Sequence, residues 1–272
     1  MTATGQETDR TQRDVRSVLG IAVDVLSWTN ATERILNWAA AGESRTVCLC
    51  NVHSLVTARN DSAHQAALAS ADMVAPDGAP IAWMLRKLGV RTQERISGPD
   101  LMWRCCAEAA RRNAGIYLYG GTEATIVSLV NALRTSFDGL KIVGWHSPPF
   151  RELSAGEDEA VIQQINASGA SLVWVGLGCP KQETFMHTHK SRIHAVMVGV
   201  GAAFDFHSGA VKRAPLWMRN SGLEWLHRLA QDPRRLARRY ILSNVIFLCS
   251  AAADVLSYRN RAARGVRQEP AR

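Results

Sequence analysis

Short apolar runs alternate along this chain with longer segments in which apolar residues recur at helical spacing. The runs are rich in β-branched residues and predict buried strands at residues 46–52, 116–119, 142–145, 172–175 and 196–200. The segments between them predict helices at residues 30–41, 53–70, 79–88, 100–113, 123–136, 157–168 and 181–191. Continuous apolar strands separated by helices are typical of a parallel sheet covered on both faces. The pattern therefore predicts an α/β fold with a mostly parallel sheet.

Residues 222–258 follow a different pattern and predict two helices, broken near Asp232-Pro233. The second helix has a broad apolar face, and its other face carries Ser243, Phe247, Ser250, Asp254 and Ser257. A transmembrane helix needs about 20 apolar residues without a charge, and this run is shorter and interrupted by Asp254. We expect either an ordinary amphipathic helix packed on the domain or a helix lying in a membrane interface, with arginines meeting anionic headgroups.

Charge divides the 272-residue chain unevenly. The net charge is +8, yet the residues from Lys212 onward carry thirteen basic and four acidic side chains, a net +9. A basic tail of this kind can meet nucleic acid, anionic lipid or a diphosphate. The whole chain contains 47% hydrophobic residues, which suits one large domain or one domain with an appendage. We expect a disordered segment at 1–17 without a signal peptide, a main domain at 18–211, a basic helical appendage at 212–258 and a disordered basic tail at 259–272.

Six cysteines occur, and none forms a C-x-x-C pair. Most lie in apolar runs, which favours buried free thiols over a disulfide framework. The expected compartment is therefore reducing.

Glycine-rich turns follow three of the predicted strands. Gly120 and Gly121 end one strand, Gly178 follows another, and Gly201 follows a third. Glycine lets backbone N–H groups approach a ligand closely, and a strand-to-helix turn aims a helix N-terminus at anions. These turns predict a phosphate-bearing ligand. The turn at 199–204 nearly matches the dinucleotide fingerprint, but Phe204 stands at its third small position, which disfavours a nicotinamide-dependent oxidoreductase.

Two loop residues are candidates for chemistry. Asp77 lies in Pro76-Asp77-Gly78 ahead of a predicted helix, where a helix cap is the commoner local interpretation and a proton-accepting carboxylate is the alternative. Arg95 precedes another helix and is either an anion site or a surface arginine. The sequence contains no D-x-D motif, which argues against a metal-chelating sugar-nucleotide site, and no P-loop or G-x-S-x-G motif.

Taken in order, these segments resemble the WecG/TagA/CpsF glycosyltransferase family (glycosyltransferase family 26). The match covers about residues 18–242, and the joint order and spacing of its motifs is far more specific than any one of them. The matching motifs are Asn51-Val52-His53-Ser54-Leu55-Val56, Pro76-Asp77-Gly78, Arg95-Ile96-Ser97-Gly98-Pro99-Asp100-Leu101, Tyr119-Gly120-Gly121, Val175-Gly176-Leu177-Gly178-Cys179-Pro180-Lys181-Gln182-Glu183, Gly199-Val200-Gly201-Ala202-Ala203-Phe204-Asp205-Phe206, Lys212-Arg213-Ala214-Pro215, Leu223-Glu224-Trp225-Leu226 and Pro233-Arg234-Arg235-Leu236.

The resemblance implies a Rossmann-like enzyme that moves a sugar from a UDP-sugar to a polyprenyl-diphosphate-linked glycan in cell-surface polysaccharide synthesis. It implies inversion at the anomeric carbon with no metal or other cofactor, at the inner face of the cytoplasmic membrane. Asp77 becomes the candidate general base and Arg95 its catalytic neighbour. The implied substrate-binding residues are Asn51, Gly120, Gly121, Gly178, Gln182, Gly201, Asp205, Arg213, Arg228, Arg235 and Arg238.

One position departs from the family pattern, because Leu49 stands where many relatives carry threonine. This leaves the transferred sugar open, as are the acceptor glycan and the oligomeric state, a homo-oligomer included. Two other classes stay as alternatives: the oxidoreductase, and a non-catalytic nucleic-acid binder that uses the basic tail. No nucleic-acid partner is expected if the family resemblance holds.

Overall fold

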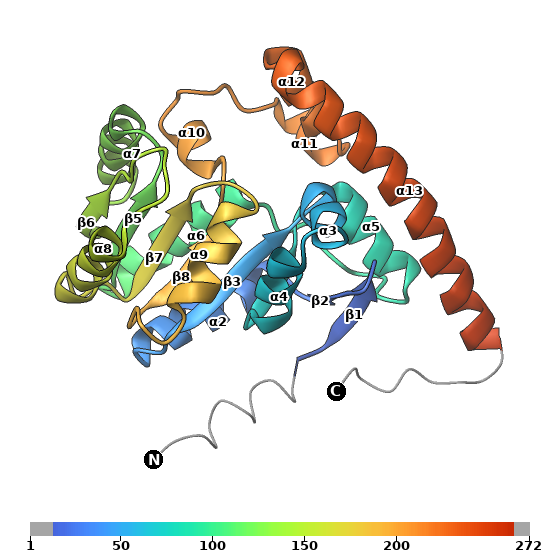
Figure 1. Cartoon of the computed structure of the whole chain (residues 1–272), viewed down its shortest axis with the longest axis horizontal. Helices are drawn as coiled ribbons and strands as arrows, with labels where there is room; N and C mark the ends of the chain where they lie inside the picture. The colour runs from blue at the N-terminus through green and yellow to red at the C-terminus, as the bar shows by residue number, and fades with distance from the viewer. Residues whose placement is uncertain (1–12, 264–272) are drawn as a thin grey trace. The chain divides into compact units, whose positions relative to one another are not determined.

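A six-stranded sheet with helices packed around it forms the framework of the protein, seen here in a computed structural model (Figure 1). The structure describes residues 13–263, except the side chains of 235, 238, 239 and 261–263. The strand order is β4 (Met73–Pro76), β3 (Arg45–Cys50), β8 (Val196–Gly199), β7 (Leu172–Gly176), β5 (Gly115–Gly120) and β6 (Lys141–His146). Each pair of neighbouring strands from β3 to β6 in this order is parallel, so the predicted Rossmann-like α/β fold is confirmed.

Every helix that the apolar spacing predicted is present, with one division. The segment predicted as a single helix over 53–70 forms α3 (Val52–Ala58) and α4 (Ser62–Ser70), because the Asp61 side chain accepts the His64 N–H and starts a new helix. The other helices are α2 (Trp28–Ala40), α5 (Ala79–Lys87), α6 (Gly98–Arg111), α7 (Glu123–Ser136), α8 (Ala155–Ala167), α9 (Lys181–His189), α10 (Ala203–His207), α11 (Leu216–Asn220), α12 (Glu224–Gln231) and α13 (Pro233–Ala263). The predicted break near Asp232-Pro233 is confirmed.

The chain divides into two compact units, and the division differs from the predicted one. Unit 1 contains the residues up to 27, residues 50–96 and the residues from 214 onward, and unit 2 contains residues 28–49 and 97–213. The predicted main domain at 18–211 therefore contributes to both units. Both predicted terminal boundaries are also wrong. Residues 15–17 belong to strand β1 (Val15–Val18), and residues 259–263 continue α13, while 1–12 and 264–272 lie outside the described residues.

Unit 2 has an aromatic core between its parallel strands and helices. Trp174, Tyr117, Tyr119 and Phe204 are among its most deeply buried side chains. Gly144 of β6 makes room for the Tyr117 ring, since a Cβ at that glycine would lie 2.6 Å from the ring carbon Cε2. Cys105 and Cys106 are buried here as free thiols, as expected for those positions, and burial raises the pKa of Cys105 to about 12.

Unit 1 is held at its start by a buried carboxylate. The hairpin of β1 and β2 (Ile21–Asp24) ends at Asp24, whose side chain is 1% exposed. Its two oxygens accept hydrogen bonds from Arg13 Nε at 2.9 Å and Nη2 at 2.5 Å, and Oδ2 also accepts the Val74 N–H at 2.7 Å. One carboxylate therefore joins the first described residues, the hairpin and β4.

Replacing Asp24 with alanine is expected to destabilise the protein by about 3 kcal/mol, because removal of one partner leaves a buried charge and a backbone donor unsatisfied. Urea denaturation of Asp24→Ala against Asp138→Ala measures this effect. Asp138 is exposed, so its replacement should change the free energy of unfolding by less than about 0.5 kcal/mol. Equal stability of the two variants would contradict this account of unit 1.

Candidate functional site

Asp77 lies directly after β4, in unit 1. Its backbone N–H donates to the Cys50 carbonyl at 2.9 Å, which fixes the end of β4 beside the end of β3. Gly78 follows with φ +85°, a conformation that favours glycine, and this residue is the N-cap of α5. No side chain in the described part of the chain caps α5, so the interpretation of Asp77 as a helix cap is wrong. The turn leaves its carboxylate free for another role.

Asn51 is placed next to Asp77 by the same strand ends. It follows β3 and is the N-cap of α3, where its side-chain oxygen accepts the Ser54 N–H at 3.2 Å. The Asn51 side chain also hydrogen-bonds to the Asp77 carboxylate. Because capping fixes the orientation of the amide, Asn51 holds the carboxylate in one position.

Two arginines and a second carboxylate surround Asp77. The Ile96 N–H donates to the Pro76 carbonyl at 2.9 Å, so the preceding residue, Arg95, is also held at the end of β4. Arg95 Nη1 lies 3.0 Å from Oε2 of Glu224, at the start of α12. Arg228, one turn further along α12, is near enough for its charge to act on Asp77. This group of Asn51, Asp77, Arg95, Glu224 and Arg228 is called the Asp77 cluster below.

The proton affinity of Asp77 is higher than that of an ordinary aspartate. Burial is the largest influence and raises the pKa of Asp77 to about 6. The smaller influences act in both directions. The positive charge of Arg95 lowers this pKa, the negative charge of Glu224 raises it, and the Asn51 hydrogen bond and the charge of Arg228 lower it. Asp77 itself is only partly exposed. A carboxylate with a pKa close to the working pH can accept a proton from a hydroxyl and return it to water.

In unit 2, the first predicted glycine turn lies at the end of β5. Gly120 has φ +123°, and a Cβ there would lie 2.6 Å from the Gly176 carbonyl carbon, so only glycine fits. The Gly121 N–H donates to the Gly176 carbonyl at 3.2 Å. Thr122 then caps α7 by accepting the Thr125 N–H. The expected turn between a strand and a helix N-terminus is therefore present.

The other two glycine turns are joined by one side chain. Gln182 is buried, and its Oε1 accepts the N–H of Gly178 at 3.2 Å and the N–H of Gly201 at 3.0 Å. Its Nε2 donates to Glu183 Oε1 at 2.9 Å. Gln182 thus ties the turns after β7 and β8 together, and its oxygen occupies the two N–H groups that the sequence offered to a phosphate.

Phe204 explains the imperfect dinucleotide fingerprint. This ring is buried, and a Cβ at Gly176 would lie 2.7 Å from its Cδ2. The ring therefore packs closely on Gly176 of β7, and a large side chain stands where the fingerprint has a small residue for close packing of helix and strand. Asp205 follows in α10 and is partly exposed.

The arginines of the tail differ in their surroundings. Arg213 donates from both terminal nitrogens to Asp100 at 2.7 Å, and Ser97 also bonds to that carboxylate, so this arginine is committed to a bidentate ion pair within unit 2. Arg228 belongs to the Asp77 cluster. The side chains of Arg235 and Arg238 lie outside the described residues.

Leu49, at the family's threonine position, is buried and packs closely on Gly98. A Cβ added at Gly98 would lie 2.9 Å from Cδ1 of Leu49.

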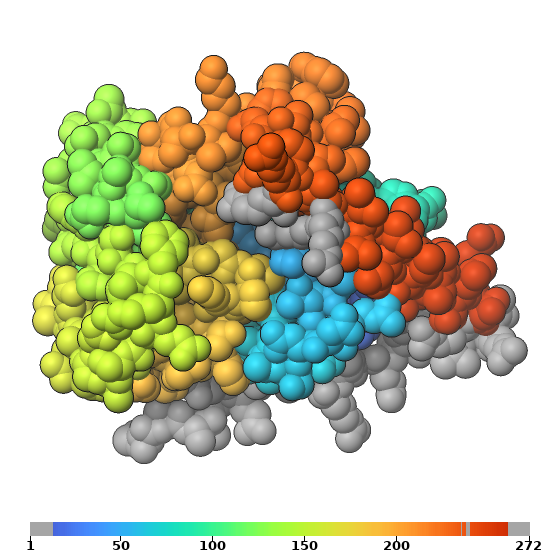
Figure 2. All heavy atoms as spheres, turned by 45° about the horizontal axis from the view of Figure 1, so that its top comes forward, coloured from blue at the N-terminus to red at the C-terminus, as the bar shows by residue number. Residues whose placement is uncertain are grey.

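Helix α13 packs on the rest of unit 1 with its more polar face. Ser243, Phe247 and Ala251 are buried, Ser250 bonds to Arg59, and Asp254 accepts the Leu19 N–H at 2.8 Å. The apolar face points outward, and α13 lies at the molecular surface beside α3 (Figure 2). The exposed large apolar residues of α13 are Ile241, Leu242, Val245, Leu248 and Leu256.

This orientation is the reverse of an ordinary amphipathic helix, so packing on the domain through the apolar face is ruled out. The expectation that the run is too short to span a membrane is also wrong, because Tyr240–Asn260 is long and apolar enough by length and composition.

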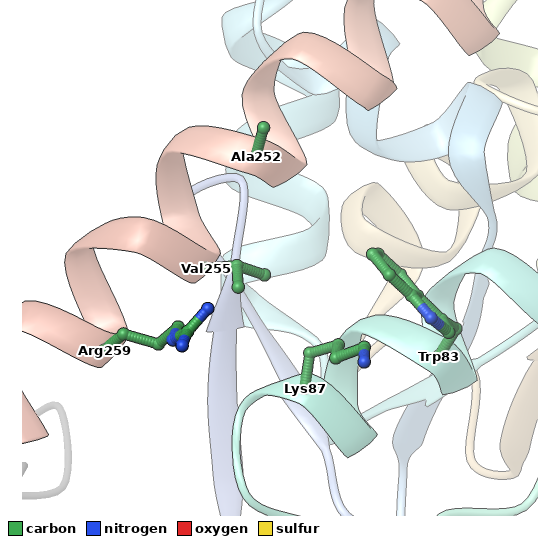
Figure 3. A pocket seen from close by; sticks show the side chains of 5 residues that line it. All are labelled: Trp83, Lys87, Ala252, Val255 and Arg259. Carbon is green, nitrogen blue, oxygen red and sulfur yellow. The ribbon is translucent and has the colours of Figure 1, made fainter.

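Between α5 and α13 lies a cavity of about 410 Å³ within unit 1 (Figure 3). Val255 and Arg259 extend into it from α13, and Lys87 and Trp83 from α5, with the Lys87 Nζ 5.7 Å from the centre of the Trp83 ring. None of the five lining residues, which include Ala252, is acidic. The cavity therefore combines two cations with an apolar wall.

Sequence reasoning named most of the Asp77 cluster but gave Glu224 no role. The available signal was the four-residue spacing from Glu224 to Arg228, which puts both on one side of α12. Spacing within α12 carries no information on contact with Arg95, 129 residues earlier, so only the fold reveals the pair.

A family model agrees with this arrangement over most of the chain. Residues 16–261 match the model described as the Glycosyl transferase WecG/TagA/CpsF family. The match includes Asp77 and its neighbours, the three glycine turns and α12. This protein therefore belongs to the WecG/TagA/CpsF family of glycosyltransferases, whose role lies in cell-surface polysaccharide synthesis.

Proposed function

We propose that this glycosyltransferase moves a sugar from a UDP-sugar to a polyprenyl-diphosphate-linked sugar acceptor, with inversion at the anomeric carbon. The observation that carries the proposal is the partly exposed Asp77 carboxylate. Burial raises its pKa to about 6, although the nearby charges of Arg95 and Arg228 act to lower it. A proton acceptor next to two cations suits the attack of a hydroxyl on a substrate that carries phosphate.

The proposed reaction is a direct displacement. Asp77 takes the proton from the acceptor hydroxyl while that oxygen forms a bond to the anomeric carbon. The bond between this carbon and the diphosphate oxygen breaks, and UDP leaves with the electron pair. Because the acceptor attacks opposite the leaving group, the configuration inverts, and Asp77 later returns its proton to water.

The leaving diphosphate needs positive charge or N–H donors. Arg95 and Arg228 supply this positive charge beside Asp77, within unit 1. The N–H groups of Gly178 and Gly201 are less suitable, since Gln182 already accepts from both. Gln182 and the paired Arg213 are therefore assigned to holding the turns and loops of unit 2.

We further propose that the protein binds the inner face of the cytoplasmic membrane through α13. Four exposed branched aliphatic side chains within eight residues form a surface that water solvates poorly: Ile241, Leu242, Val245 and Leu248. The cavity with Lys87 and Arg259 lies farther along the same helix and suits the phosphate of an anionic lipid. Attachment of Asp254 to Leu19 holds the helix on the folded unit, which favours a position in the interface.

Replacement of Asp77 by asparagine is expected to lower turnover by ~10²–10⁴-fold, the usual contribution of a general base, and to leave donor binding nearly unchanged. Sugar transfer from UDP-sugars to a short polyprenyl-diphosphate-sugar is measured beside calorimetric donor binding. Asp138→Asn, at an exposed position of unit 2, serves as the matched control. Unchanged turnover in Asp77→Asn would remove Asp77 from the mechanism.

The pH dependence follows from the same group. Only ionised Asp77 can accept the proton, so kcat/KM should rise with pH up to about 6, fall about tenfold for each pH unit below this value, and level off above it. Profiles of the wild type and Asp77→Asn test this sign, because the acid limb should vanish from the residual activity of the variant. An identical acid limb in both proteins would mean that another group titrates.

Membrane binding is tested with Leu248→Asp, at a side chain that is 64% exposed and whose replacement spares the core. We expect at least tenfold weaker binding to phosphatidylglycerol vesicles in a cosedimentation assay, since burial of a leucine side chain contributes about 1.5–3 kcal/mol. Val127→Asp, an exposed apolar position of α7, should bind like the wild type.

The cavity is tested separately. Combined Lys87→Glu and Arg259→Glu replacements should weaken binding to anionic but not to neutral vesicles. Equal binding by all variants would refute the membrane proposal.

A further inference from the structure

An ion pair joins helix α12 to Arg95. Glu224 Oε2 lies 3.0 Å from Arg95 Nη1, and the two side chains are only 18% and 19% exposed. A pair sheltered to this degree is screened less by solvent than a surface pair. The contact joins the C-terminal segment to the loop that follows β4.

The rest of α12 adds little apolar anchoring. None of its residues, all of which the structure describes, is buried, and Trp225 and Leu226 remain 38% and 44% exposed. Its helical neighbours are α11 and α13, which belong to the same C-terminal segment. The polar contact to Arg95 is therefore a principal attachment of α12 to the part of unit 1 that carries Asp77.

We propose that Glu224 is a positioning residue that locks α12 onto Arg95 and thereby sets the charge around Asp77. The inference rests on the proposed function of Asp77 as proton acceptor. It gives the C-terminal segment a direct part in activating the acceptor hydroxyl, separate from any contact with lipid.

The charges that act on Asp77 give the proposal a definite sign. Arg95 and Arg228 favour the ionised carboxylate, Glu224 opposes it, and Asn51 donates a hydrogen bond to it. Glu224 also neutralises Arg95 by pairing with it. Loss of the Glu224 charge therefore strengthens the net positive field at Asp77 and lowers the pKa of its carboxyl.

The test is the pH profile of Glu224→Gln. Its acid limb should move to lower pH by roughly one unit, the lower end of the shift caused by a neighbouring charge. Arg95→Gln should move it in the opposite direction, and Glu224→Asp, which keeps the charge, should stay nearer the wild type. The control is Glu152→Gln, at an exposed position of unit 2, whose profile should be unchanged.

A second readout does not depend on turnover. The ¹³C signal of the Asp77 carboxyl, assigned by its absence from Asp77→Asn, reports the titration in the wild type and in Glu224→Gln. A lower midpoint in the variant supports the inference even if no tested donor is transferred, in which case the proposed reaction alone fails. An unchanged midpoint, with or without lower turnover, would overturn it and leave Glu224 a purely structural contact.

Discussion

Two backbone hydrogen bonds at the end of β4 determine the geometry on which the candidate chemistry depends. The Asp77 N–H bonds to the Cys50 carbonyl, and the Pro76 carbonyl accepts the Ile96 N–H. Three segments that are distant in sequence are thereby brought together, and each supplies one polar side chain: Asn51, Asp77 and Arg95. Strands that end side by side are the usual place for ligand sites in α/β proteins, because the following loops converge there. Positive φ at Gly78 completes the arrangement by turning the chain into α5 without using the carboxylate as a cap.

The C-terminal segment has two different relations to the rest of unit 1. Glu224 and Arg228 bring charge to Asp77, while α13 docks through Ser250, Asp254 and the buried Phe247. Tyr258 adds a close contact, since a Cβ at Gly89 would lie 2.6 Å from its hydroxyl. Docking by the polar face leaves the apolar face outward, an arrangement that is costly in water and favourable at a bilayer. We therefore propose two roles for this one segment: it would bring the protein to a lipid-linked acceptor, and it would adjust the group that activates that acceptor.

Sequence patterns predicted the sheet and most helices well, because buried parallel strands such as Leu172–Gly176 are continuous apolar runs. They missed β1, β2 and β4, whose four-residue segments were not recognised as strands. The local signal at Asp77 favoured a cap, and only its place in an ordered set of motifs corrected this. The motifs included Gln182 and Glu224, but the sequence did not reveal what these two side chains contact. Their partners, the Gly178 and Gly201 N–H groups and Arg95, become neighbours only through the fold. The orientation of α13 was likewise hidden, because composition does not reveal which face docks.

The most direct test of the account is UDP release by the purified full-length protein from a panel of UDP-sugars, with and without a short polyprenyl-diphosphate-sugar acceptor. The account predicts release from one donor that requires the acceptor and yields a product of inverted anomeric configuration. Release that is independent of the acceptor, or a product of retained configuration, would contradict the direct displacement assigned to Asp77.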